Sequence, residues 1–581
     1  MSDHFECVDV ALRRQVDRRP DKVAIWDSTG SATFAELWDH AARLAGALRG
    51  KGVGDGDAVG VFGVGDRDSI VAMLGVLLAG GHFVPVDPGY PAERVDRMMT
   101  TAGATVLLGT EGHDVPAVAG VDVWQVRQLV SAGEPSEGTA GAPDRLAYVM
   151  FTSGSTGAPK AVGVPHGALT ALCLRAGPVR RRADDGFLVH TILTFDPSML
   201  EIWSALLVGA SVVCAPRRAV SLHETADLLR DKRVTTAILT PAVFALMVET
   251  YPAALGELRC LIVGGDVMPV AHAARVRELC PGLEVVNCYG PTENCVVSTA
   301  FSLTGWDGSG TSVPIGPPVA GSTAYVLDGA LCPLPVGEVG DLHVGGDRLA
   351  SGYVGDPALT EERFVPDPFV PGARMYRTGD RAALLPTGGF EFRGREDDEL
   401  KVRGYRVNLA EVAALLAEDP EVREVVAVPV GSGHDRRIRA FVRPASAEVD
   451  PALIRARVAA RAPQFLVPDE IELVDGFALR STGKVDRAAL LSRVDSRPEA
   501  SSVAPPDDRA ALAAMWRERT GTEADSGADF FDAGGSSLDL IRLIEDISRA
   551  FAVPLDFEDV YGVRSFDELW EMVRSHPARS A

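Results

Sequence analysis

Short runs of β-branched and other apolar residues alternate with longer amphipathic stretches through the first 400 residues. Helical spacing of apolar residues marks the stretches between the runs, for example at 221–231 and 269–279. Because strands that alternate with helices build parallel sheets, the pattern predicts two α/β units within the first 300 residues. A strand-like region rich in glycine and proline follows at 311–395. The strand-like runs of the first part lie at 58–62, 105–108, 147–151, 211–215, 236–240, 259–264 and 284–288.

One long apolar stretch, 69–86, raises the question of a membrane span. It carries no formal charge, but glycine and proline interrupt it, and its strongly apolar part is only about ten residues, too short to cross a bilayer. The pattern therefore predicts a buried helix followed by a strand. The first ten residues lack the basic and apolar regions of a signal peptide, so we expect no membrane association.

The pattern changes after residue 396, which we take as the end of a large α/β unit at 1–396. A smaller α+β unit is expected at 397–495. Its predicted elements are helices at 410–418 and 451–461 and strands at 422–430 and 438–442.

The last part of the chain differs from both units. Residues 496–506 are rich in proline, serine and alanine and lack apolar periodicity, which is typical of a linker. Residues 507–581 hold 16 acidic and 8 basic residues, a net charge of about −8, and no lysine. Apolar residues recur there at helical spacing, around 512–516, 538–544 and 569–573. A small acidic helical bundle is the predicted structure.

Composition narrows the classes of function. The chain has 581 residues and a formal net charge of −23, which repels a phosphate backbone and argues against nucleic-acid binding as the main task. Eight cysteines are scattered without a C-x-x-C pair. They are typical of reduced thiols rather than of a metal site or a disulfide framework, so a cytoplasmic protein is expected.

A loop rich in hydroxyls follows one of the predicted strands. The segment from Phe151 to Lys160 reads FTSGSTGAPK. Glycines let backbone N–H groups approach an anion, hydroxyls donate hydrogen bonds, and a lysine adds charge, so the segment favours a phosphate site. A flexible polar turn is the alternative, and the spacing of the usual nucleotide-triphosphatase loop is absent.

Two further turns carry groups that suit a nucleotide. The segment from Asn287 to Glu293 (NCYGPTE) places an amide, a phenol, a hydroxyl and a carboxylate after a strand, and its carboxylate suits Mg²⁺. The segment from Tyr376 to Asp380 (YRTGD) ends in a carboxylate that could accept hydrogen bonds from two ribose hydroxyls. Plain surface turns are the alternatives at both places.

Three motifs near the domain boundaries complete the set. The charge-dense segment 394–406 lies where the two units meet, and a hinge or a solvated strand edge would both look like this. Lys484 lies in a Gly-Lys turn that could deliver an ammonium group to a neighbouring cleft or be a plain surface lysine. Ser537 follows two glycines at the start of a predicted helix, where a phosphodiester is favoured, although a helix-capping serine is common there.

The order and spacing of these motifs resemble an adenylation domain of the non-ribosomal peptide synthetases followed by its peptidyl carrier domain, within the adenylate-forming (ANL) superfamily. Further matching segments are 78–87 (LAGGHFVPVD), 340–346 (GDLHVGG) and 463–468 (PQFLVP). The resemblance implies a multidomain chain: a large α/β subdomain, a small α+β subdomain and an all-α four-helix carrier domain.

The resemblance also implies the reaction. The carboxylate of an amino acid would attack the α-phosphorus of ATP to give aminoacyl-AMP and pyrophosphate, and a phosphopantetheine thiol would then take the aminoacyl group. In the first step, Lys484 would bridge the substrate carboxylate and the phosphate. The small subdomain would then rotate about Asp397 and withdraw Lys484 before the second step. Ser537 would carry the 4′-phosphopantetheine.

Other site residues are carried over from the matching motifs. The expected cradle for the β- and γ-phosphates is Thr152, Ser153, Gly154, Ser155, Thr156, Gly157 and Lys160. Thr292 would face the α-phosphate and Glu293 would bind Mg²⁺. The expected nucleoside site is Asn287, Tyr289, Phe392, Asp380 and Arg395.

The substrate pocket is carried over in the same way. Asp196 resembles the residue that pairs with the α-ammonium group of an amino acid. The other expected walls are Pro197, Leu200, Ala242, Ile262, Gly264, Cys288, Val296 and Val297. None of these walls is charged, which disfavours charged side chains. Because Ala242, Gly264 and Cys288 are small, we expect a large hydrophobic substrate, preferably aromatic.

The resemblance brings in partners. A phosphopantetheinyl transferase would modify Ser537, and a downstream synthetase or a tailoring oxygenase would take the product. A small MbtH-like protein binds many relatives, and no residue here decides whether it is needed. Two other functions stay open: an acyl- or aryl-acid ligase of the same superfamily, which Asp196 and Ser537 disfavour, and a non-catalytic nucleotide-binding scaffold, which Lys484, Glu293 and Asp380 together disfavour.

Overall fold

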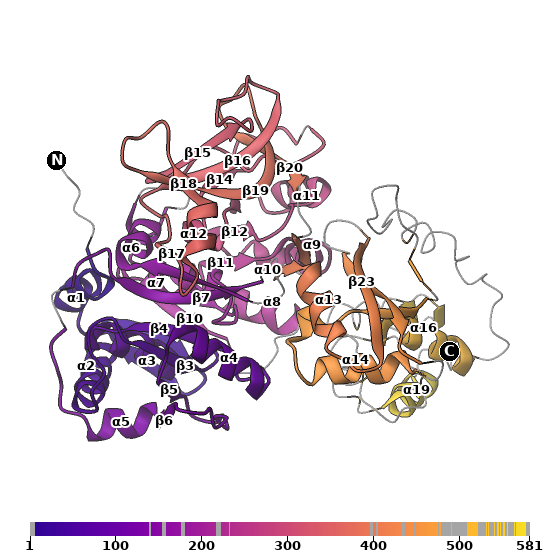
Figure 1. Cartoon of the computed structure of the whole chain (residues 1–581), viewed down its shortest axis with the longest axis horizontal. Coiled ribbons are helices and arrows are strands. Elements are labelled where there is room, and N and C mark those ends of the chain that lie inside the picture. Colours follow the sequence, from indigo (N-terminus) through magenta and orange to yellow (C-terminus); the bar gives the residue numbers. More distant parts are fainter. Residues whose placement is uncertain are drawn as a thin grey trace.

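The chain is described from a computed structural model, and Figure 1 shows its parts in chain order. A large lobe contains the indigo to salmon segments, the orange segment forms a smaller unit beside it, and the yellow helices lie at the same end as the orange unit. The structure describes residues 6–576 except 139–140, 154–158, 176–179, 216–221, 232, 309, 396–398, 403–404, 432–435, 447–448, 475, 478–489, 491–507 and most of 521–564.

The first sheet of the large lobe is mostly parallel. Among the described residues its order is β17 (Gly352–Tyr353), β8 (Lys160–Pro165), β7 (Leu146–Thr152), β4 (His82–Val86), β3 (Ala58–Phe62), β5 (Val106–Gly109) and β6 (Asp122–Gln125). Strands β3, β4 and β5 pair in parallel, whereas β7 and β8 are antiparallel. The antiparallel pair brings Thr152 opposite Lys160, at the two ends of the predicted phosphate loop.

The second sheet has the same character. Its order in the described part of the chain is β14 (Thr299–Ser302), β13 (Glu284–Tyr289), β12 (Cys260–Gly264), β11 (Thr236–Leu239), β9 (Gly186–Val189), β10 (Ser211–Cys214), β1 (Val23–Asp27) and β2 (Gly30–Thr33). Strands β11, β12 and β13 run in parallel, so their carboxyl ends share one edge. Residues that follow these strands therefore meet at that edge.

Helices join and cover these strands. They are α1 (Val8–Arg18), α2 (Phe34–Gly50), α3 (Arg67–Ala79), α4 (Ala92–Ala102), α5 (Val126–Ala132), α6 (His166–Leu174), α7 (Pro197–Leu206), α8 (Leu222–Arg230), α9 (Pro241–Thr250), α10 (Pro252–Leu255), α11 (Val270–Leu279) and α12 (Pro357–Arg363). Helix α3 begins at an N-cap, because the Asp66 carboxylate accepts a hydrogen bond from the Ser69 N–H, and it ends at Gly80 with φ 102°. All of α3 after Arg67 is buried.

An antiparallel sheet closes the large lobe. It pairs β15 (Ser322–Leu327), β16 (Val339–Gly346), β19 (Arg374–Leu384) and β18 (Phe364–Pro366) in this order, and β20 (Phe390–Arg395) pairs with a later part of β19 than β18 does. The long strand β19 carries Tyr376 and Asp380. It therefore positions both side chains from one rigid element.

The small unit is α+β. It contains β21 (Glu399–Val402), β22 (Tyr405–Asn408), α13 (Leu409–Ala417), β23 (Val422–Val430), β24 (Arg437–Pro444), α14 (Pro451–Ala459) and β25 (Glu470–Leu473). Strands β23, β24 and β25 form one sheet, and α13 and α14 bury apolar residues of the same core. The Asn408 and Asp450 side chains cap α13 and α14 by accepting N–H hydrogen bonds.

In the C-terminal part, α16 (Asp508–Thr520) and α19 (Phe566–Ser575) are described as whole helices. They share one apolar core, in which Trp516 packs edge-on against Phe530 and Phe566. Leu540 and Leu543, from the predicted helical stretch at 538–544, lie in the same core. The acidic helical bundle expected from apolar spacing is consistent with this cluster.

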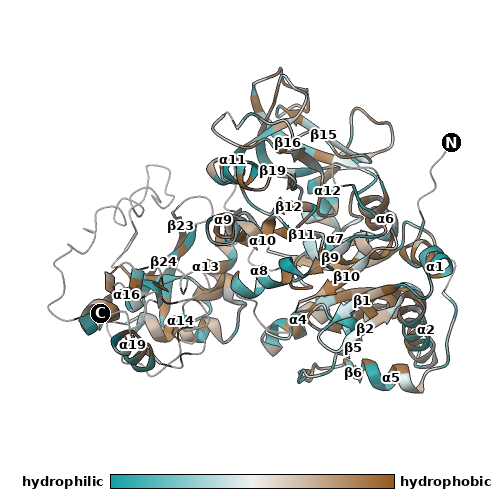
Figure 2. Ribbon diagram, turned by 180° about the vertical axis from the view of Figure 1, so that it is seen from behind, coloured by the Kyte–Doolittle hydropathy of each residue, from teal (hydrophilic) through white to brown (hydrophobic). Residues whose placement is uncertain are grey.

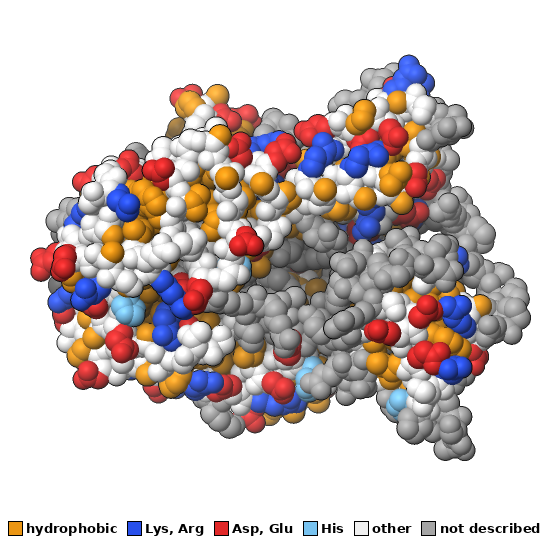
Figure 3. Space-filling view, turned by 90° about the horizontal axis from the view of Figure 1, so that it is seen from below, with side chains coloured by type: hydrophobic (Ala, Val, Ile, Leu, Met, Phe, Trp, Pro, Cys, Tyr) orange, Lys and Arg blue, Asp and Glu red, His pale blue; other side chains and the backbone are white. Residues whose placement is uncertain are grey.

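The predicted pattern of elements agrees closely with the structure. Strand β3 has the predicted bounds, and the apolar stretch at 69–86 is α3 followed by β4, as expected. Figure 2 shows brown, hydrophobic residues along the inner strands and teal residues on the outer helices. None of the described helices combines the length and the apolarity that a bilayer span requires. On the face shown in Figure 3, acidic and basic side chains are interspersed.

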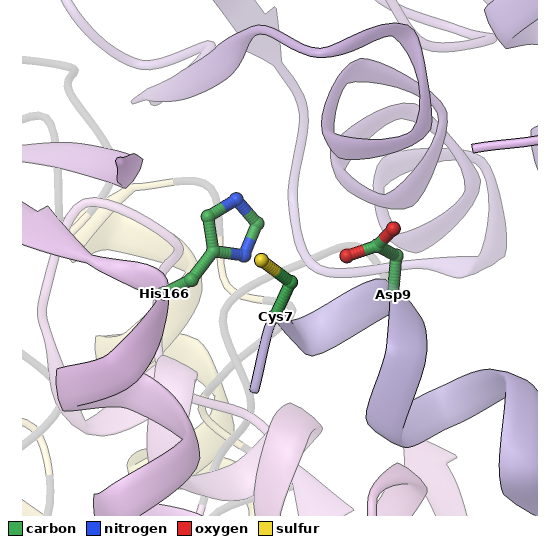
Figure 4. Close-up of side chains that lie close together, drawn as sticks. All are labelled: Cys7, Asp9 and His166. Carbon is green, nitrogen blue, oxygen red and sulfur yellow. The ribbon is translucent and has the colours of Figure 1, made fainter. Parts of the chain in front are cut away.

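The start of α1 is tied to α6 by three buried side chains, Cys7, Asp9 and His166 (Figure 4). The His166 Nδ1 atom accepts a hydrogen bond of 3.2 Å from the Val8 N–H, and the Cys7 thiol donates to the Gly141 carbonyl over 3.2 Å. Burial lowers the pKa of His166 to about 4 and raises the pKa of Cys7 to about 11. The histidine is therefore neutral, and this cluster anchors helices rather than offering the four ligands of a structural zinc site.

Candidate active site

Two adjoining cavities open at the carboxyl ends of β11, β12 and β13. The larger has a volume of about 210 Å³ and the smaller about 80 Å³. Cys288, Tyr289, Asp380 and Arg395 line both of them. A ligand with two parts could therefore extend from one cavity into the other, and a crevice at the carboxyl ends of parallel strands is where α/β folds bind ligands.

The phosphate segment begins at the end of β7. The Thr152 Oγ1 and Ser153 Oγ atoms are buried and have no hydrogen-bond partner among the residues that the structure describes. Lys160, across the strand pair, is 8% exposed, and its Nζ atom lies 5.9 Å from the ring centroid of Tyr353. Buried hydroxyls without partners are rare in folded proteins. Two of them beside a buried lysine fit the phosphate oxygens of a nucleotide.

A hydrogen-bond network centred on Asp380 lies where the cavities meet. The Tyr289 hydroxyl donates to Oδ2 of Asp380, and Arg395 Nη1 donates to Oδ1 over 2.5 Å. Burial, followed by the neighbouring Asp380 charge, raises the pKa of Tyr289 well above its usual value, so the phenol stays protonated. Phe392 lies beside Tyr289, with 6.5 Å between ring centroids. The network holds the Asp380 carboxylate in a fixed position facing the larger cavity.

Asn287 and Thr292 lie on either side of Tyr289 in the sequence. Asn287 on β13 is 3% exposed and donates from Nδ2 to the Pro314 carbonyl over 2.8 Å. Thr292 begins a short 3-10 helix, Thr292–Asn294, and lines the smaller cavity. The predicted base-binding residue thus faces the larger cavity and the predicted phosphate-facing residue the smaller one.

Glu293 is completely buried and fully engaged. Its Oε1 atom accepts hydrogen bonds from the Tyr353 hydroxyl over 2.7 Å and from the Tyr376 hydroxyl over 2.8 Å. Its Oε2 atom accepts from Arg406 Nη1 over 2.9 Å. Burial and the Glu293 charge raise the pKa of Tyr353, which keeps it a donor. A carboxylate suits Mg²⁺, but Oε2 becomes available to a cation only when Arg406 withdraws.

Arg406 belongs to the small unit, on β22, so this ion pair crosses between the two lobes. A second contact between the lobes joins Arg94 on α4 to Glu411 on α13 over 3.9 Å. The Arg94 guanidinium also lies 6.0 Å from the ring centroid of Phe465. In the arrangement described here, the small unit therefore supplies a cation to the centre of the site.

The smaller cavity brings together most of the predicted substrate residues. Asp196, at 6% exposure, lies at the start of α7, and Leu200 follows one turn later. The predicted residues that line the cavity are Asp196, Pro197, Leu200, Ile262, Gly264, Cys288, Val296 and Val297. A Cβ atom added at Gly264 would lie 2.9 Å from the Cys288 carbonyl oxygen, so no larger residue fits there without a shift.

The place of Ala242 in the substrate wall stays a prediction. Ala242 lies in the first turn of α9 and is not among the described residues that line the cavity. Ile238, four residues earlier on β11, lines the cavity. Strand β11 therefore contributes a large aliphatic side chain to this wall.

A family model described as AMP-binding enzyme matches residues 12–354. The chain belongs to the AMP-binding enzyme family. A second model, described as phosphopantetheine attachment site, matches residues 510–573, so this AMP-binding enzyme is an adenylation domain joined to a peptidyl carrier domain. It is an adenylating ligase that uses ATP and Mg²⁺, and the carrier domain bears 4′-phosphopantetheine on a serine.

Its relatives include much longer proteins. The enzyme is 37% identical over 580 residues to tyrocidine synthase 3 of Brevibacillus parabrevis, an alignment that covers 98% of this chain and 9% of the relative. It is 35% identical over 576 residues to phosphinothricin tripeptide synthetase PhsC of Streptomyces viridochromogenes, covering 96% of this chain and 52% of the relative. The chain therefore spans about a tenth of the first relative and about half of the second.

Solved structures match the enzyme over most of its length. Holo-PA1221, an NRPS protein with adenylation and PCP domains bound to a vinylsulfonamide inhibitor, superposes with a TM-score of 0.86 and 30% identity, covering 99% of this chain and 98% of that chain. The artificially fused adenylation–PCP di-domain NpsA-ThdA of Klebsiella oxytoca gives a TM-score of 0.76 at 26% identity, covering 85% of this chain and 98% of that chain.

Several expected residues of the AMP-binding enzyme lie outside the part of the chain that the structure describes. They are Gly154, Ser155, Thr156, Gly157, Asp397, Lys484 and Ser537. Their roles remain predictions from the motifs.

Sequence reasoning missed three groups that contact Glu293. Tyr376 opens the YRTGD motif and Tyr353 lies in another segment, but nothing in a sequence shows that two phenols converge on one carboxylate. Arg406 closes the charge-dense segment 394–406, which drew attention as a hinge. The charge density was a usable signal for Arg406, whereas its partner depends on how the two lobes are arranged.

Proposed function

We propose that this enzyme activates an α-amino acid with a compact hydrophobic side chain as its aminoacyl adenylate and transfers it to its own carrier domain. Within the family, an adenylation–carrier protein activates an amino or aryl acid. The observation that carries the amino-acid assignment is Asp196, a buried carboxylate at the rim of the smaller cavity. A carboxylate in a closed site attracts an ammonium group and disfavours an acid that lacks one.

The proposed side chain is smaller than the sequence suggested. The aromatic preference rested on three small walls, and one of these, Ala242, is not among the described lining residues, which include the larger Ile238. A water-sized group needs about 10–15 Å³, so a cavity of about 80 Å³ holds roughly five to eight such groups. With its amino and carboxylate groups, valine or proline has about eight non-hydrogen atoms and leucine about nine, against about twelve for phenylalanine, so the volume favours the smaller amino acids.

The proposed chemistry is positioning and charge neutralisation. Thr152, Ser153 and Lys160 would donate to the β- and γ-phosphates, as the partnerless buried hydroxyls suggest. Asp380 would accept from the ribose hydroxyls. Glu293 would hold Mg²⁺, which would neutralise phosphate charge. In the arrangement that adenylates, Lys484 would offset the charge on the attacking carboxylate and the α-phosphate.

Transfer depends on the second part of the chain. A 4′-phosphopantetheine on Ser537 would supply the thiol that accepts the aminoacyl group, after a phosphopantetheinyl transferase has modified the serine. Rotation of the small unit about Asp397 would remove Lys484 from the site and bring in Arg406, which contacts Glu293 in the arrangement described here. A downstream synthetase or tailoring enzyme would take the product, and an MbtH-like protein is a further candidate partner.

Pyrophosphate exchange with single amino acids tests the proposal. We expect strong exchange with one of valine, leucine, isoleucine or proline, weak exchange with phenylalanine, tyrosine and tryptophan, and none with benzoic acids. Asp196→Asn should lose amino-acid exchange while keeping nucleotide affinity, with Asp367→Asn, a buried carboxylate that lines neither cavity, as the matched control. Strong exchange with an aryl acid that Asp196→Asn leaves unchanged would favour the aryl-acid ligase instead.

A further inference from the structure

The turn from Cys295 to Val297 forms one wall of the smaller cavity and has an unusual backbone. Cys295 has φ 49° and Val296 has φ 70°, and Leu331 is the one other non-glycine residue with a positive φ in the described part of the chain. A β-branched residue is strongly disfavoured in this left-handed region. Two non-glycine residues with positive φ in succession persist only where the surrounding structure holds them.

Backbone contacts hold part of the turn. The Ser298 N–H donates to the Tyr289 carbonyl over 2.8 Å, and the Val297 N–H donates to the Cys295 carbonyl over 2.8 Å. The turn also packs against Gly290, where an added Cβ atom would lie 2.4 Å from the Val296 carbonyl oxygen. None of these contacts uses the Val297 carbonyl oxygen.

Arg348 binds that oxygen. It is 2% exposed, its Nη1 atom donates to the Val297 carbonyl over 2.9 Å, and its Nη2 atom donates to the Ala320 carbonyl over 3.1 Å. Among the described residues no carboxylate lies within ion-pair distance of Arg348. Burial lowers its pKa to about 10, and the nearby Arg181 contributes in the same direction, yet the guanidinium stays charged at neutral pH.

Burying a guanidinium that no carboxylate neutralises costs folding free energy. Its retention here is explained by the two carbonyls that it joins, because a planar group with several fixed donors can bridge them at once. One of these carbonyls belongs to the cavity wall, and the other to the segment before β15. Arg348 itself does not line the cavity.

We propose that Arg348 is a positioning residue for the substrate pocket: it holds the strained Cys295–Val297 turn and thereby sets how large an amino-acid side chain the pocket accepts. The inference rests on the proposed amino-acid activation and deepens it. It predicts that selectivity changes without any change in the residues that touch the substrate.

The kinetic experiment compares Arg348→Met with Arg49→Met in full-length enzyme. Arg49 is a matched control, because it also binds backbone carbonyls, those of Leu78 and Ala79, in another part of the lobe. For Arg348→Met we expect KM for the preferred amino acid to rise about tenfold, KM for ATP to stay within about twofold, and larger side chains to gain relative kcat/KM. Arg49→Met should leave these ratios unchanged.

Val296→Gly supplies the rescue. Glycine adopts a positive φ without strain, so the turn should need its clamp less. In the Val296→Gly background, Arg348→Met should raise the amino-acid KM by less than about threefold. An equal rise in both backgrounds would show that the strained turn is not what Arg348 acts on. Arg348→Lys, which keeps the charge, serves if Arg348→Met does not fold, and it should give the same pattern in smaller measure.

Hydrogen exchange separates this inference from the proposed function. Amides of a peptide covering 293–299 should exchange about tenfold faster in Arg348→Met than in wild type, and unchanged in Arg49→Met. If wild type activates no amino acid, the proposed function fails while the exchange result still decides the role of Arg348. Unchanged exchange, or unchanged selectivity with only a lower melting temperature, overturns the inference.

Discussion

The ion pair between Arg406 and Glu293 gives a prediction that can be worked through in numbers. It joins the two lobes, Glu293 is fully buried, and the Arg406 side chain is 15% exposed. A hydrogen bond to a charged group contributes about 1.5–3 kcal/mol, so Arg406→Gln should cost this arrangement of the lobes about 2 kcal/mol. At 1.4 kcal/mol per tenfold, its population relative to other arrangements should fall about 30-fold.

The two half-reactions should respond differently. If aminoacyl transfer uses the arrangement described here, Arg406→Gln should slow transfer to the phosphopantetheinylated carrier by about 10- to 30-fold. Pyrophosphate exchange should be unchanged or slightly faster, because the cation that occupies Oε2 of Glu293 is gone. Rapid-quench measurement of acyl transfer beside steady-state pyrophosphate exchange reads both quantities.

Arg94→Gln is the control for this comparison. Its contact with Glu411 also crosses the lobes, but at 3.9 Å it is too long for a hydrogen bond, so a smaller effect on the transfer rate is expected. Equal transfer rates in Arg406→Gln and wild type would refute the reasoning. A parallel loss in both half-reactions would refute it as well, since it would place Arg406 in a role common to both steps.

Other predictions address the carrier, the pocket, the thiols and pH. Ser537→Ala should abolish the mass gain seen with a phosphopantetheinyl transferase in intact-protein mass spectrometry and leave pyrophosphate exchange intact. Asp196→Asn should lower kcat/KM for the amino acid about 10- to 100-fold, and calorimetry should find nucleotide affinity unchanged. Cys332 is exposed while the other seven cysteines are buried, so a thiol-reactive dye should label about one thiol quickly in the folded enzyme, and Cys332→Ser should remove that phase. Burial lowers the pKa of His166 from 6.5 to about 4, so as the pH falls the unfolded chain binds this proton before the folded chain does. The free energy of unfolding of the large lobe should therefore be constant above pH 6.5 and fall by up to about 3 kcal/mol toward pH 4. Calorimetric melts should find a smaller fall in His166→Gln.

Local pattern was sufficient to predict most of the secondary structure. Strands of the large lobe such as β3 and β12 consist of apolar runs buried on both faces, and burial of that kind leaves a continuous signal in the sequence. Helix α3 shows the same signal. Its length, together with the glycine that ends it, distinguished it from a membrane span.

The site was predictable where one motif supplies one wall. Asp196, Pro197 and Leu200 belong to a single segment and line one cavity together. The place of Ala242 stays a prediction. It lies on α9, in a different segment, so the motif that carries Asp196 does not position it.

Contacts between distant segments were beyond the sequence. Glu293 receives phenols from β17 and β19 and a guanidinium from β22, three segments that are separated from it by 60 to 113 positions. The Arg348 clamp is of the same kind. Nothing near either residue in the chain names its partner, because the partner is chosen by tertiary packing.

The wall shared by the two cavities has a practical consequence for anyone redesigning monomer choice. Cys288 faces both compartments, so enlarging or shrinking it to admit a different building block also reshapes the space meant for the nucleoside. Ile238 and Leu200 face the smaller compartment alone. Libraries that vary these two positions first would change which amino acid is accepted while leaving the ATP site unchanged.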